Sequence, residues 1–170
     1  MAELTSQERL QPSLLDRLTD DDPQNQRESR DKRVLNLRRM REGVIRDLSW
    51  LLNTGNLDSV EDLEPFPEVV NSVVNYGMPH LSGNTASGVV VRDIEQRIRS
   101  AIVKFEPRIL SNSIRVRISM DSEKFSHNAM VMEIQGELWA QPVPERLFLK
   151  TDIDLETGDV KISDHSGGVM

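Results

Sequence analysis

Up to Phe105, the chain carries apolar side chains at helical spacing. From Asp31 to Leu52 they recur every three or four positions, which predicts a long amphipathic helix that ends before Asn53. A second long helix is predicted from Val90 to Phe105, and a shorter one begins at Pro67. The first helix should bury Leu37, Met40, Val44, Leu48 and Leu51, the second Val91, Ile94, Ile98, Ala101, Ile102 and Phe105, and the short helix carries Val69, Val70, Val73 and Val74.

After Pro107 the apolar residues instead alternate with polar ones, as in strands that bury one face. Strands are predicted over residues 114–120, 130–138 and 147–155, with a short fourth strand at 160–162. Arg115 and Arg117 would face outward on the first strand, and Glu133 and Glu137 on the second, which favours pairing of these two strands. Helices followed by strands predict an α+β fold, in which the helices pack on one face of a small antiparallel sheet.

The N-terminal region is divided by a polar stretch. Residues 19–33 contain no large apolar side chain, so they cannot offset the entropy of ordering and are predicted to form a mobile linker. The preceding residues 1–18 include Leu14, Leu15 and Leu18 at helical spacing. They are predicted to be either a docking segment for another protein or a helix folded back on the main domain. That domain should span residues 34–163, followed by a flexible tail at 164–170.

Composition narrows the class of protein. The 170 residues carry a net charge of −7 and include no cysteine, which excludes a disulfide scaffold, a zinc–thiolate site and a cysteine nucleophile. The N-terminus lacks the basic and apolar stretches of a secretory signal, and no apolar run is long enough to span a membrane. We therefore expect a cytoplasmic protein without direct membrane insertion.

Charge is distributed unevenly along the chain. Residues 91–117 hold seven basic residues against three acids, whereas residues 55–69 hold five acids and no base. An acidic total argues against nucleic acid as a partner, because nucleic-acid binding requires a concentrated positive face. This uneven distribution of charge suits a molecule that contacts different proteins on different faces. The alternative explanation is ordinary surface charge that faces solvent.

Few residues offer catalytic chemistry. The sequence contains no nucleotide-binding or hydrolase motif and no metal-ligand spacing, so neither a cofactor nor a metal is predicted. A glycosidase would need two carboxylates about 5 to 10 Å apart across a cleft. Glu106 with Glu133 or Glu137 is the pair that the sequence suggests for this alternative.

Two stiff segments are candidate contact sites for other proteins. Pro107 pushes Glu106 out of the helical conformation, so the helix ends in a corner that should display one acid and one base, Glu106 and Arg108. Arg108 can bind a carboxylate through two nitrogens, and the alternative is a helix end with two solvated charges. In the second segment Pro142 and Pro144 stiffen a connection beside Trp139, which is either an interface anchor or a core residue under a loop.

Four stretches, taken together and in this order, resemble TssE, the baseplate subunit of bacterial type VI secretion systems. TssE is similar to the wedge protein of contractile phage tail baseplates, a family sometimes labelled lysozyme-like. The stretches are Pro12–Leu18, Arg46–Thr54, Phe105–Arg108 and Gly136–Arg146.

The resemblance implies a structural subunit rather than an enzyme. It would stand beside the baseplate proteins TssF, TssG and TssK and link them to the first ring of the TssB/TssC sheath, whose interlocking fold its sheet resembles. Glu106, Pro107 and Arg108 correspond to the family's hallmark and are implicated in that joining. Peptidoglycan hydrolysis is the alternative that the lysozyme-like label implies, and the family supports it poorly.

A physical mechanism follows for such a joint. An open sheet edge offers backbone N–H and C=O groups to which a strand of the sheath can add. The charges of the corner would then select the partner and its register, while Leu14, Leu15 and Leu18 tether a neighbouring wedge component. Repetition around a ring makes such weak contacts strong through effective concentration.

Overall fold

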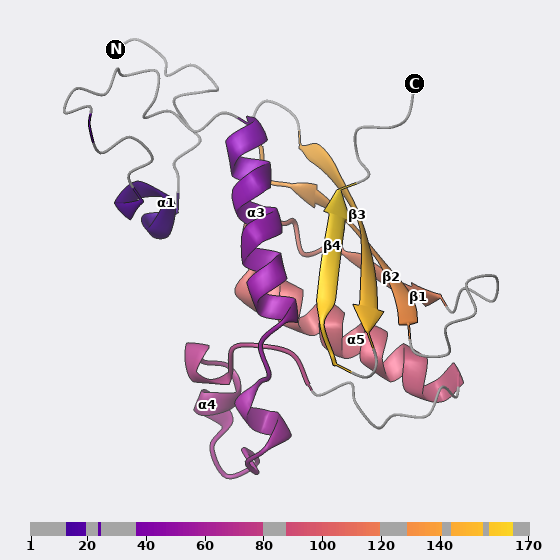
Figure 1. Cartoon of the computed structure of the whole chain (residues 1–170). Helices are drawn as coiled ribbons and strands as arrows, with labels where there is room; N and C mark the ends of the chain where they lie inside the picture. Colours follow the sequence, from indigo (N-terminus) through magenta and orange to yellow (C-terminus); the bar gives the residue numbers. More distant parts are fainter. Residues whose placement is uncertain are drawn as a thin grey trace.

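The computed structural model describes residues 13–19, 24, 37–79, 88–119, 129–140, 144–154 and 157–164. Helices precede an antiparallel sheet whose strands lie in the order β1-β2-β3-β4 (Figure 1), which confirms the predicted α+β fold. The helices are α1 (Leu14–Leu18), α3 (Leu37–Leu52), η2 (Leu57–Ser59), α4 (Pro67–Val70), η3 (Val73–Asn75) and α5 (Gly88–Phe105), and the strands are β1 (Arg115–Ser119), β2 (Ala129–Leu138), β3 (Glu145–Asp154) and β4 (Val160–Asp164).

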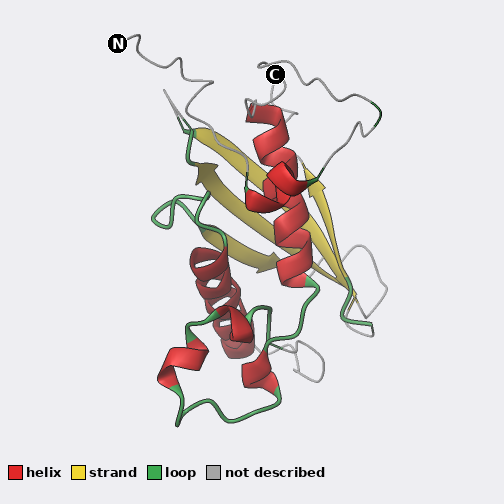
Figure 2. Cartoon of the chain, turned by 90° about the vertical axis from the view of Figure 1, so that its left-hand side faces the viewer, coloured by secondary structure: helices red, strands yellow, loops and turns green. Residues whose placement is uncertain are grey.

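The two long helices supply the helical side of the core. Helix α3 ends at Leu52 and α5 at Phe105, as predicted, while the expected start at Asp31 lies outside the described residues. Most of the predicted stripe residues are buried, but Leu37 is exposed and Val91, Ala101 and Phe105 are only half-buried. Helix α3 lies beside β4 and α5 beside β1, which Figure 2 shows from a second direction.

The sheet follows the predicted alternation closely. Its inward-facing positions on β2 and β3 are buried, and Thr151 satisfies its hydroxyl by donating to the Met132 carbonyl at 2.9 Å. The strands pair as neighbours in chain order, with Arg117 opposite Glu133 as expected. Arg115, however, lies opposite Gln135, and Glu137 lies opposite Arg146 of β3, because the register places Glu137 beyond the end of β1.

The segment between α3 and α5 differs from the prediction. Helix α4 ends at Val70, so the expected helix carrying four valines is wrong, and Val73 is 81% exposed in the separate turn η3. The cause is local: the Val70 carbonyl accepts a hydrogen bond from the Asn75 side chain, and the Ser72 hydroxyl accepts one from the Val74 amide. We refer to residues 57–75, which project beyond the long helices in Figure 1, as the acidic lobe.

The predicted boundaries of the linker and tail remain predictions. Of residues 19–33, only Thr19 and Gln24 are described, and Asp164 is the last described residue, at the end of β4. One cluster of buried apolar side chains extends from Met40 in α3 to Val160 in β4. Among the described helices, none combines the length and apolar character needed to cross a membrane.

Candidate partner-binding site

The Glu106–Arg108 corner is fixed between a helix and a strand. The Glu106 amide makes the last helical hydrogen bond, to the Ile102 carbonyl at 2.9 Å, and Pro107 then turns the chain. The chain next runs along β2, because the Arg108 carbonyl accepts from the Trp139 amide at 2.7 Å and the Leu110 amide donates to Glu137 at 2.8 Å. The predicted stiff corner is therefore held on both sides by backbone hydrogen bonds.

The two charges of this corner bind one another. Arg108 Nε donates to Glu106 Oε1 at 2.7 Å, and Arg108 Nη2 bonds to Glu106 Oε2 and to Asp47 of α3. Glu106 is only 3% exposed, so the expectation that the corner displays its acid is wrong. A carboxylate in this buried position is stable only if a cation neutralises it, and Arg108 provides two parallel hydrogen bonds.

The electrostatics of the corner favour this pairing. Burial by itself lowers the pKa of Arg108, but the hydrogen bonds and charge of Glu106, followed by those of Asp47, outweigh it and leave that pKa above its ordinary value. Arg108 therefore remains a cation at any physiological pH. The Arg108 side chain is 24% exposed, so Arg108 reaches the surface in part while Glu106 stays inside.

A chain of ion pairs extends from the corner to the N-terminal helix. Asp47 also contacts Arg46 at 2.8 Å, and Arg46 Nη1 donates to Asp16 of α1 at 2.7 Å. Ser13 caps α1: its hydroxyl donates to Asp16 Oδ2 at 2.6 Å and accepts from the Asp16 amide at 3.2 Å. A side chain on Gly43 would lie 3.5 Å from both Asp16 Oδ2 and Arg108 Nη1, so α1 and the corner meet above this glycine.

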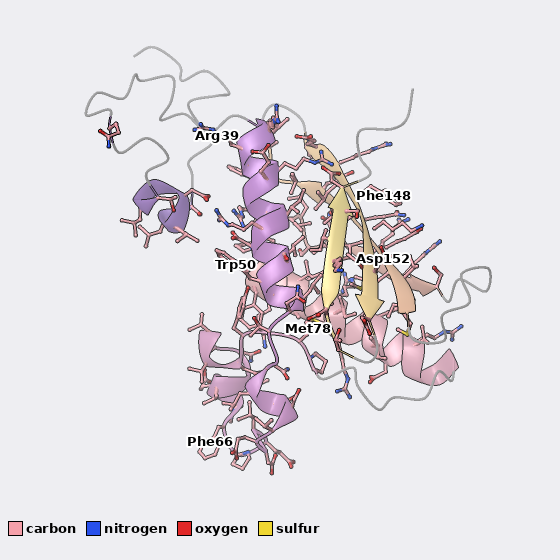
Figure 3. The ribbon with its side chains drawn as sticks, in the orientation of Figure 1. Arg39, Trp50, Phe66, Met78, Phe148 and Asp152 are labelled. Carbon is pink, nitrogen blue, oxygen red and sulfur yellow. The ribbon has the colours of Figure 1, made fainter. Side chains whose placement is uncertain are left out.

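The leucines of α1 point away from this polar contact. Leu14 and Leu18 are 71% and 74% exposed, and Leu15 is also exposed. Helix α1 is therefore folded back on α3 through its polar side, while its leucines are exposed. Arg46 also lies over the Trp50 ring at 5.1 Å, and Trp50 is 50% exposed. Figure 3 labels Trp50 on α3.

We call this surface the corner face and define it by residues from three elements. It joins two predicted contact sites, the leucines of α1 and Arg108, that are far apart in the sequence. Local spacing did not reveal Asp16, Arg46, Asp47 or the close approach at Gly43, although Arg46-Asp47 next to the apolar stripe of α3 was a possible signal. The members of the corner face are Leu14, Leu15, Leu18, Arg46, Trp50 and Arg108.

The second predicted segment is only partly described. Trp139 is 49% exposed, so the alternative of a core tryptophan under a loop is wrong, and its amide bonds to the corner at Arg108. Pro144 is exposed and Pro142 lies outside the described residues. Strand β3 begins at Glu145, so the connection is shorter than predicted.

Of the carboxylates in the glycosidase alternative, Glu106 is bound by a cation. Both oxygens of Glu106 accept from Arg108, and its burial leaves no room for a sugar to reach it. On the sheet, Glu133 lies opposite Arg117 and Lys150. In the described part of the chain, no cluster of three or more acidic, histidine or cysteine side chains could hold a metal ion.

The β4 edge of the sheet is covered by α3. The Val160 amide donates to Asn53 Oδ1 and the Val160 carbonyl accepts from Asn53 Nδ2, both at 2.9 Å, so a side-chain amide occupies the place of a neighbouring strand. At the other end of β4, Arg41 binds Asp164 through two nitrogens and Glu145 through a third. Helix α3 thus holds this edge at both ends.

The β1 edge is covered by side chains of α5. The Ile118 amide donates to Glu95 at 2.8 Å, and the Ile114 carbonyl accepts from Arg99 at 3.1 Å. Because peptide groups alternate in direction along a strand, those of Val116 also face outward. Two side chains therefore cap the β1 edge, as Asn53 and Arg41 cap the β4 edge.

Comparison with known proteins agrees with the sequence resemblance. A family model described as "Baseplate wedge protein gp25" matches residues 38–143, well over half of the chain. The matched range contains α3, α5, β1, β2 and the Glu106–Arg108 corner, and it ends before β3. No curated protein matches the chain.

Proposed function

The chain belongs to the baseplate wedge protein gp25 family, and from this we infer that it is the subunit of a type VI secretion apparatus that joins the baseplate wedge to the first ring of the contractile sheath. The family supports a structural role in a baseplate. The observation that carries the finer proposal is the presence of two separate surfaces suited to protein contact, the corner face and the β1 edge.

The corner face suits the baseplate partners, which the resemblance implies are TssF, TssG and TssK. Its exposed leucines and Trp50 provide apolar anchors of the kind that dominate binding energy in interfaces. Arg108 Nη1 and Asp16 of α1 both lie near Gly43, and this partly exposed arginine can bind a carboxylate of the partner. A surface that combines apolar anchors with a charged group suits a specific contact, because the charge selects the partner. Such a contact could be repeated in each wedge.

The β1 edge suits the TssB/TssC sheath. A strand of the first sheath ring would pair with Val116 after Glu95 and Arg99 rotate away, and the sheet would grow from four strands to five. We prefer this edge because β4 is capped at both ends, by Asn53 and by the ion pairs of Arg41 with Asp164 and Glu145. In such an assembly the protein would be recruited to the cytoplasmic side of the inner membrane by its neighbours.

Sheath initiation in cells tests the corner face. A strain lacking the gene, with a fluorescent sheath subunit, would receive Leu14→Ser with Leu18→Ser, two changes at exposed positions that leave the core intact. We expect sheaths to be lost. The matched control is Val103→Ser on α5, also exposed, which should assemble normally. Normal sheaths in the double variant would contradict the role of the α1 leucines.

The choice of edge is tested by proline, which removes a backbone donor. Val116→Pro removes an outward-facing amide from β1, and Ile162→Pro is the matched change on β4. We expect Val116→Pro to abolish sheath attachment and Ile162→Pro to retain it, provided that circular dichroism shows both variants folded. The opposite result would assign the sheath strand to β4.

A further inference from the structure

The acidic lobe presents a third surface, apart from the corner face and the sheet edges. Residues 57–75 include five acidic residues and no lysine or arginine. Every one of these acids is exposed, so the negative charge lies on the surface of the lobe. They are Asp58, Glu61, Asp62, Glu64 and Glu68.

The same lobe also exposes large apolar side chains. Val73 and Val74 are 81% and 65% exposed, Val60 is 68% exposed, and Phe66 is 58% exposed. Figure 3 shows Phe66 at the end of the lobe farthest from α3. Single exposed apolar residues are common, but four within one short acidic segment indicate a contact surface.

The lobe is held in place by specific hydrogen bonds. At its base, the Asn56 amide donates to the Met78 carbonyl at 2.9 Å, and the Met78 amide donates to the Thr54 carbonyl at 2.7 Å. Inside it, Asn75 accepts from the Asp58 amide and donates to the Val70 carbonyl. The exposed side chains are therefore carried on an ordered backbone, which lowers the entropy lost on binding.

The lobe is also tied to the body of the protein. Lys104 of α5 donates to the Val70 carbonyl, and Leu63 is buried within the lobe. Gly77 has a φ of 127°, and a side chain there would collide with the Thr54 carbonyl, so the base is shaped around a glycine. The lobe lies at the C-terminal end of α3, below α1 in the view of Figure 1.

The chemistry of the lobe selects its partner. Nucleic acids and anionic membranes carry negative charge and would be repelled by five carboxylates. A partner that covers exposed valines and a phenylalanine must itself be apolar, and one that neutralises the carboxylates must be basic. We propose that the acidic lobe is the docking site for a basic, apolar segment of a different protein subunit.

A model peptide tests this proposal on the isolated full-length protein. The probe is a fluorescein-labelled amphipathic peptide of leucine and lysine, and its binding is followed by anisotropy. Glu61→Gln with Glu64→Gln should weaken binding about fivefold, the size expected for two exposed ion pairs. The matched control is Asp152→Asn with Asp159→Asn, two exposed acids elsewhere, which should change binding less than about twofold.

The apolar part of the proposal is tested with the same probe. Phe66→Ser leaves the charge unchanged and should also weaken binding at least about fivefold, since burying a phenylalanine is worth this much or more. The proposal is overturned if the wild-type protein does not bind the probe, if the control variant loses as much affinity as the lobe variant, or if Phe66→Ser has no effect.

Photocrosslinking identifies the partner in the assembled state. A photoreactive amino acid in place of Val73, in bacteria that assemble the apparatus, should crosslink to a subunit segment rich in basic and apolar residues. A crosslink to lipid, to another copy of this chain or to an acidic segment would overturn the proposal, as would no crosslink at all. The peptide experiment does not depend on the sheath, so its failure is distinguishable from failure of the proposed joining function.

Discussion

Replacing Arg108 with alanine should destabilise the fold, because the buried carboxylate of Glu106 would lose its cation. In the wild-type protein both Glu106 oxygens accept from Arg108, and Glu106 is almost completely buried. Asp47 also loses its contact with Arg108, but it keeps Arg46 and access to water. The stability of the corner thus depends mainly on the pairing of Glu106 with Arg108.

The magnitude follows from the burial of the pair. Removing one partner of a buried ion pair costs about 3–5 kcal/mol, and the partial exposure of Arg108 places the expected loss near the lower end, about 3 kcal/mol. In a chain of this length that loss lowers Tm by about 6–12 °C. Glu106→Gln keeps a hydrogen-bond acceptor and should cost about 1 kcal/mol.

Urea unfolding followed by far-UV circular dichroism measures these differences. The series consists of the wild type, Arg108→Ala, Glu106→Ala and the double variant, for which we expect a coupling free energy of about 2 kcal/mol. If Arg108→Ala unfolds within about 0.5 kcal/mol of the wild type, with unchanged m, then the pair does not support the fold and this reasoning is wrong. Assembly of these variants should be compared only where each is fully folded.

Three further predictions concern single residues. Gly77→Ala should cost about 2 kcal/mol or more in urea unfolding, because φ is 127° and the new methyl group meets the Thr54 carbonyl; an unchanged midpoint would exclude this strain. Asn53→Ala should cost about 1–2 kcal/mol and speed amide exchange at the start of β4, since two hydrogen bonds to that strand are lost; unchanged exchange would show that the edge is closed by other means. Burial by itself raises the pKa of Asp16, but its hydrogen bond to Ser13 and its pairing with Arg46 outweigh burial and leave that pKa below its ordinary 3.8. Docking of α1 should therefore be complete above pH 3.8 and be lost as the pH falls below it. Amide chemical shifts of α1 that move at neutral pH instead would contradict this prediction.

Local patterns in the sequence predicted the elements well where a period is continuous. The ends of the long helices at Leu52 and Phe105 follow from turn residues and a proline, and the buried positions of β2 and β3 follow from strict alternation. The short helix at Pro67 was predicted too long, because side-chain hydrogen bonds from Ser72 and Asn75 ended it. Side chains that compete with the helix for backbone hydrogen bonds do not change the spacing of apolar residues, so this spacing cannot reveal them.

The sequence predicted some residues of the candidate site, namely Arg108 and the leucines of α1, but not the arrangement of the site. Proline chemistry correctly identified a rigid corner, yet nothing near Glu106 shows that its carboxylate is buried. The partner of Arg108 on α3, Asp47, lies 61 positions away, and the residue that closes β4, Asn53, lies 107 positions from Val160. Contacts at these separations arise from the packing of α3 against the sheet, which local spacing does not encode.

The most direct test of the joining function is a pull-down of tagged protein from bacteria that assemble the apparatus, with the captured subunits identified by mass spectrometry. The wild type should bring down both wedge and sheath subunits. Leu14→Ser with Leu18→Ser should lose the wedge subunits, whereas Val116→Pro should keep them and lose the sheath. Capture of neither class by the wild type, or loss of both classes together in each folded variant, would contradict a protein that joins two neighbours through two separate surfaces.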